Sequence, residues 1–70
     1  MSDWIPVDSS NLSMIKYDEE TRTLEIEFHG GRRYQYFEVP PRVFENLKTA
    51  PSKGKYFHEN IRDTYRYTRM

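Results

Sequence analysis

The chain has no cysteine, only three glycines and no net charge, because 11 acidic side chains balance 11 basic ones. Without cysteine it holds neither a disulfide framework nor a cysteine-ligated zinc ion. It also lacks a long apolar run and a basic, apolar N-terminal region. We therefore expect a soluble cytoplasmic protein that is not secreted and does not cross a membrane. Its length predicts a single domain over residues 1–70.

Aromatic residues compensate for a low apolar content. Hydrophobic residues make up 36% of the chain, and 16% of all residues are aromatic. Because aromatic side chains bury the most area per residue, they favour a folded core over disorder. Trp4 is the largest apolar side chain, and it either covers this core or anchors a partner from the surface. We expect it to cover the core.

The charges are unevenly distributed along the chain. Residues 1–31 carry a net charge of −5, and residues 32–70 carry a net charge of +5. One interpretation is that an acidic half and a basic half of the same domain pair with each other. The other is that the basic half forms a surface for a polyanion. Composition leaves both open.

The hydrophobic pattern predicts a β-hairpin and its register. Residues 24–28 alternate between apolar and acidic side chains, and the aromatic-rich run 32–38 follows the loop 29–31. A three-residue loop with Gly31 left-handed gathers the apolar side chains on one face, while a one-residue slip would invert them all. This register places Glu27 across from Arg33 and forms two apolar pairs, Ile26 with Tyr34 and Leu24 with Tyr36.

The flanking segments complete an α+β fold. Residues 13–17 alternate as well, so a turn at 19–22 would make a three-stranded antiparallel meander. The prolines at 40 and 41 end the third strand, and residues 42–50 read as a short amphipathic helix that begins at Pro41. Ser52 suits the N-cap of a second short helix over 53–62. Tyr65 and Tyr67 form either a fourth, C-terminal strand or an extended tail.

A set of residues spread over nearly the whole chain resembles the KTSC domain family. The set comprises residues 7–10, 17–18, 24–28, Gly31, 34–36, 39–40, Ala50, Ser52, Gly54, 56–57, 61–62 and Tyr65. This family is a module of about this length that occurs at the C-terminus of some lysyl-tRNA synthetases and as free-standing small bacterial and phage proteins. The resemblance implies an RNA-binding role, by association with the synthetase.

Three aromatic residues are candidates for stacking on unpaired bases. Tyr34 and Tyr36 would do so if they are exposed, whereas the predicted register makes them a core pair. Phe37 falls on the outer face of the predicted sheet, where it either stacks on a ligand or packs under the loop 39–41.

The predicted start of the second helix is a candidate phosphate site. Ser52, Lys53, Gly54 and Lys55 would offer backbone N–H groups, positive charge and room for close approach. The alternative is that Ser52 only caps the helix and Gly54 packs against a neighbour. The spacing is not that of a nucleotide-binding P-loop. Other cations of the basic half could join this site in a basic patch, namely Arg32, Arg33, Arg42, Arg62, Arg66 and Arg69. Arg62 and Arg66 are four residues apart, so they would share a face if the second helix continues that far.

The sequence gives little support to catalysis. His29 falls in a turn and His58 on a helix surface, and no cluster has the spacing of a metal or cofactor site. We therefore expect a non-catalytic module that binds RNA or another phosphate-bearing ligand through the basic half. The alternative is a protein-interaction module, such as a phage-type effector or a homo-oligomer that associates through a sheet edge. The sequence leaves the oligomeric state open.

Overall fold

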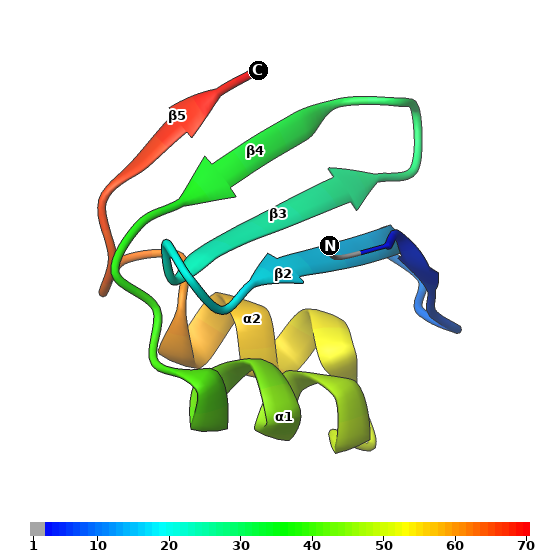
Figure 1. Cartoon of the computed structure of the whole chain (residues 1–70). Coiled ribbons are helices and arrows are strands. Elements are labelled where there is room, and N and C mark those ends of the chain that lie inside the picture. The colour runs from blue at the N-terminus through cyan, green and yellow to red at the C-terminus, as the bar shows by residue number, and fades with distance from the viewer. Residues whose placement is uncertain (1–2) are drawn as a thin grey trace.

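A single antiparallel sheet with two helices on one face makes up the protein (Figure 1). The computed structural model describes residues 3–70. The strands lie side by side in chain order, so the α+β meander expected from the sequence is confirmed. They are β1 (Ile5–Pro6), β2 (Leu12–Asp18), β3 (Thr23–Phe28), β4 (Arg33–Tyr36) and β5 (Tyr67–Arg69). The helices are α1 (Pro41–Thr49) and α2 (Lys53–Asn60). The short edge strand β1 was not predicted.

The β3–β4 hairpin has the predicted register. Ile26 lies opposite Tyr34, and Leu24 lies opposite Tyr36. The loop closes with the Phe28 N–H donating to the Arg32 carbonyl at 2.8 Å. Both loop glycines have positive φ, +100° at Gly30 and +91° at Gly31, so the turn uses two left-handed residues where the sequence predicted one.

The core lies between the inner face of the sheet and the two helices. The Tyr17 ring of β2 stacks on Phe44 of α1 with centroids 4.8 Å apart, and its hydroxyl donates to the Val39 carbonyl. The tyrosine hydroxyl thereby satisfies a buried backbone acceptor between β4 and α1. The buried apolar residues are Leu12, Ile15, Tyr17, Leu24, Ile26, Tyr36, Val39, Val43, Phe44, Leu47, Phe57 and Ile61.

The helix boundaries follow local capping chemistry. Pro41 occupies the first position of α1, as predicted, and the Ser52 hydroxyl accepts a hydrogen bond from the Lys55 N–H at 3.3 Å, which confirms the N-cap of α2. Helix α2 ends at Asn60, two residues earlier than predicted, because Ile61 leaves helical geometry and enters the core. Within residues 3–70, neither helix is long and apolar enough to traverse a bilayer.

The outer face of the sheet holds Trp4, which was expected to cover the core. Ile5 pairs with Ile15 of β2, so strand alternation directs the preceding residue to the opposite face. There the Trp4 ring lies 5.0 Å from the Arg33 guanidinium and 5.7 Å from the Lys16 ammonium. The expectation was wrong because cation–π attraction holds the ring over two strand cations rather than over the core.

Replacing Gly31 by L-alanine should destabilise the hairpin. A Cβ at this position meets nothing within 4 Å, so the penalty comes only from the φ of +91°. We expect a loss of about 1–2 kcal/mol in the free energy of unfolding, measured by urea denaturation. D-Alanine, introduced by chemical synthesis, suits positive φ and should retain full stability. Equal losses in both variants would contradict the backbone explanation.

The burial of Tyr36 should appear in the pH dependence of stability. Desolvation, assisted by the neighbouring Tyr67, raises the pKa of Tyr36 from its usual 10 to about 12. Its contribution to stability is therefore complete below pH 10 and is lost as the pH rises from 10 to about 12. Urea denaturation across this range should show a steeper fall for the wild type than for Tyr36→Phe. Parallel curves of stability against pH for the two proteins would contradict the raised pKa of Tyr36.

Candidate functional site

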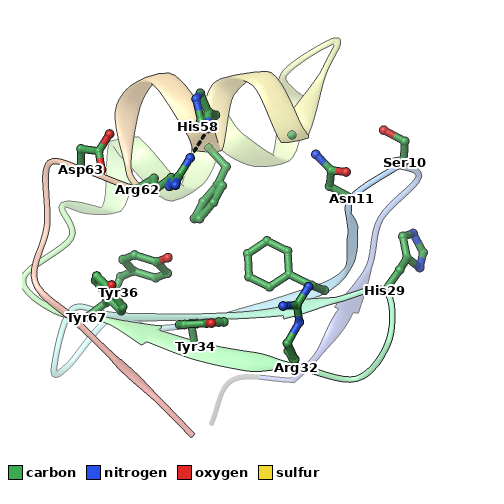
Figure 2. Close-up of a pocket in the computed structure, with 13 residues that line it drawn as sticks. Ser10, Asn11, His29, Arg32, Tyr34, Tyr36, His58, Arg62, Asp63 and Tyr67 are labelled. Carbon is green, nitrogen blue, oxygen red and sulfur yellow. Dashed lines mark hydrogen bonds between the residues drawn. The ribbon is translucent and has the colours of Figure 1, made fainter.

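A cleft of about 560 Å³ opens between α2 and the inner face of the last three strands (Figure 2). Strand alternation places Tyr34 and Tyr36 of β4 on this inner face, and Tyr67 of β5 lies opposite Tyr36. Phe28 and Phe57 complete the aromatic lining from β3 and α2. The cleft therefore follows directly from the hairpin register.

The tyrosines differ in how much ring surface they offer to a ligand. Tyr36 is only 3% exposed, and its ring packs edge-to-face against Phe57 at 5.4 Å, so it is a core residue. Tyr34 is half-buried, and Tyr67 is 57% exposed, with their ring centroids 5.8 Å apart. Of the predicted stacking residues, Tyr34 is thus the one that lines the cleft with accessible ring surface, and Tyr67 joins it.

Arginines border these tyrosines on both sides of the cleft. Arg32 enters from the residue before β4 and Arg62 from the turn after α2, as Figure 2 shows. An Arg62 Nη1 group donates to Nδ1 of His58 at 3.0 Å, which orients the guanidinium and requires His58 to carry its proton on Nε2. Arg69 lies opposite Tyr34 in the β4–β5 ladder and therefore extends from the same face. One carboxylate, Asp63, also lines the cleft.

Only one cation of the basic half, residues 32–70, forms an ion pair with the acidic half, residues 1–31, within the described residues 3–70. Among residues 3–70 two ion pairs form, Arg33–Glu27 at 2.8 Å and Lys48–Glu45 at 3.0 Å, and only the first joins the two halves. Within the same described part of the chain, the three arginines of the cleft face have no carboxylate within 4 Å. They are Arg32, Arg62 and Arg69.

Outside the start of α2, three predicted site residues lie away from the cleft. Arg33 is on the outer face of the sheet, ion-paired with Glu27 beneath Trp4. Phe37 follows β4, is half-buried and does not line the cleft. Arg66 is exposed just before β5 and is not helical, because α2 ends at Asn60, so the helical spacing that would have placed it beside Arg62 does not apply.

The predicted phosphate site at the start of α2 makes local contacts. Lys53 is half-buried, and its ammonium donates to the Ala50 carbonyl at 3.2 Å, while Lys55 is exposed and its N–H is taken by Ser52. Gly54 lines the cleft, where it faces the carboxamide of Asn11. Of the four residues predicted at this site, Gly54 alone lines the cleft. The sequence left open that Gly54 packs against a neighbour, and that neighbour is Asn11.

Sequence reasoning missed part of the cleft lining because those residues come together only through tertiary contacts. Ser10 and Asn11 precede β2, His29 lies in the hairpin loop, and Asp63 follows α2. His58 is different, since its spacing of four residues from Arg62 was a usable signal of a shared helix face. Residues 3–70 contain no group of three potential metal ligands.

The KTSC domain family matches residues 8–65. The chain is 40% identical over 63 residues to a lysine–tRNA ligase of Nostoc punctiforme, which covers 90% of this chain but only 11% of the ligase. An uncharacterised protein of Stutzerimonas stutzeri is 39% identical over 94% of both chains. The crystal structure of a KTSC domain protein from Yersinia pestis superposes with a TM-score of 0.93 at 37% identity, covering 100% of this chain and 99% of that one. The chain belongs to the KTSC domain family.

Proposed function

We propose that this protein is a non-catalytic module that binds single-stranded RNA, or a ligand with the same phosphate chemistry, in the cleft beside α2. The observation that carries the proposal is the combination of accessible tyrosine rings with arginines that have no carboxylate partner within residues 3–70. Tyrosine and arginine on one surface are characteristic of nucleic-acid interfaces.

Each part of the cleft has a role in this proposal. Bases stack on Tyr34 and Tyr67, an interaction worth roughly 1–3 kcal/mol per base and tolerant of sequence. Arg32, Arg62 and Arg69 contact phosphates from the surrounding walls. His58 supports this role by holding the Arg62 guanidinium through the 3.0 Å hydrogen bond.

The distribution of charge favours this cleft over another cavity of the protein. That cavity, about 530 Å³, lies at the β2–β3 turn and is lined by four carboxylates, those of Asp3, Asp18, Glu19 and Glu20. A polyanion is repelled there and attracted to the cleft, so the protein's own field would orient an approaching RNA.

The relatives of this chain add support by association. The chain matches about a tenth of the length of proteins named lysine–tRNA ligase. That name describes enzymes whose substrate is a tRNA. A module joined to such an enzyme encounters RNA, and we extend that context to the present protein. The same context favours the cytoplasm as its place of action.

Removing the cleft arginines should weaken RNA binding in a salt-dependent way. In fluorescence-anisotropy titrations with a short unstructured RNA, log K should fall with log[salt] by roughly 0.7 per phosphate contact. Arg32→Ala and Arg62→Ala should each lower the affinity and reduce this slope by about 0.7. Arg42→Ala, an exposed cation of α1 outside the cleft lining, is the matched control and should change neither. Absence of binding at low salt, or equal losses in all three variants, would refute the proposal.

Removing the cleft carboxylate should have the opposite effect. Asp63→Asn deletes the one acidic group in the lining, so RNA affinity should rise several-fold at low salt, and the gain should shrink as salt screens the charges. Glu20→Gln, at the distant β2–β3 turn, serves as the control for the change in net charge. An equal gain in both variants would mean that only the overall charge matters and would contradict binding in the cleft.

A protein partner remains the alternative function, and one observation favours it. Strand β5 is an edge of the sheet, and its segment exposes two large apolar side chains, Tyr67 and Met70, each 57% accessible. A partner bound there would associate with little dependence on salt. Capture of the same partner from lysate with and without nuclease treatment distinguishes this alternative from RNA binding.

A further inference from the structure

The carboxamide of Asn11 stands on the cleft wall without a hydrogen-bond partner among residues 3–70. Two histidines of the lining each use one ring nitrogen in a hydrogen bond within the protein. The Nε2 of His29 lies 2.8 Å from the Ser9 carbonyl and donates to it, and Nδ1 of His58 accepts from Arg62. Asn11 is exposed and is the one carboxamide that residues 3–70 contribute to the lining, so it presents a donor and an acceptor side by side to a ligand.

The backbone around Asn11 is held firmly. Its N–H donates to the Ser9 hydroxyl at 3.2 Å, and its carbonyl accepts from the His29 N–H at 3.0 Å. These two bonds tie the segment before β2 to the hairpin loop. The Asn11 side chain therefore projects into the cleft from a fixed point, near the first turn of α2 (Figure 2).

Gly54 leaves the space that this side chain occupies. A Cβ added at Gly54 would lie 3.2 Å from Nδ2 of Asn11 and 3.7 Å from its Cγ. An alanine here would therefore shift the carboxamide by a few tenths of an ångström. The glycine that the sequence marked as a phosphate contact thus acts on the cleft through Asn11.

We propose that Asn11 contacts the edge of a nucleobase and that the cleft prefers adenine. This inference rests on the proposed function. The carboxamide oxygen of Asn11 would accept from the adenine N6 amino group while its Nδ2 donates to N7, the pairing that asparagine makes with adenine. Phosphate oxygens only accept hydrogen bonds, so the carboxamide oxygen of Asn11 can pair with the amino group of a base but not with phosphate.

The test compares short oligoadenylate, oligouridylate and oligocytidylate by fluorescence anisotropy at one salt concentration. The wild type should bind oligoadenylate at least about five-fold more tightly than the other two. Asn11→Ala should abolish this preference while leaving the salt slope unchanged, because the phosphate contacts remain. Asn46→Ala, at an exposed asparagine of α1 outside the cleft, is the matched control and should retain the preference.

Gly54→Ala provides a second variant in which the Asn11 residue itself is kept. It should reduce the adenine preference by displacing the carboxamide, with circular dichroism confirming that the protein is folded. Equal affinities for the three oligonucleotides, or a preference that survives Asn11→Ala, would overturn the base-reading role while leaving RNA binding intact. Absence of binding to all three would instead refute the proposed function and this inference with it.

Discussion

The pairing of Ile26 with Tyr34 and of Leu24 with Tyr36 across the central hairpin determines both the core and the cleft. Side chains alternate between the two faces of a strand, so a one-residue shift would bring Arg33 and Gln35 to the inner face instead. Helix α2 would then pack on polar side chains, and no aromatic surface would line the cleft. The three-residue loop with two left-handed glycines is the local feature that enforces this register.

The fold converts a chain with no net charge into a molecule with separated charges. The cleft face carries Arg32, Arg62 and Arg69, whereas the cavity at the β2–β3 turn is lined by four carboxylates. The only ion pair between the acidic and basic halves within residues 3–70 lies on the outer face of the sheet. Net charge alone would have hidden this polarity, because attraction of a polyanion depends on the local potential rather than on the sum.

Those parts of the structure that depend on local patterns could be predicted from the sequence. Alternation and the glycine loop determined the hairpin register, and Pro41 and Ser52 marked the starts of the two helices. The same alternation placed Arg33 opposite Glu27 on the outer face. This outer-face position already separates Arg33 from the cleft tyrosines, and only the Trp4 contact above Arg33 was not predictable.

Contacts between distant segments were not predictable in the same way. Trp4 lies on the outer face because β1 adds to the sheet edge, and a two-residue strand has no periodicity to recognise. The cleft joins residues before β2 to residues of α2, and no motif connects Asn11 with Gly54. Arg66 would share a helix face with Arg62 only if α2 continued that far, and α2 ends at Asn60; helix ends are the least certain part of such a prediction.

An amide-resolved NMR titration with single-stranded RNA tests the central claim most directly, because it locates the bound surface whatever the affinity. The account predicts that the largest shifts occur at Asn11, Arg32, Tyr34, Arg62 and Tyr67, around the cleft, and that the outer-face residues Lys16 and Glu25 stay unperturbed. Shifts concentrated on the outer face or at the β2–β3 turn, or no shifts at low salt, would contradict it.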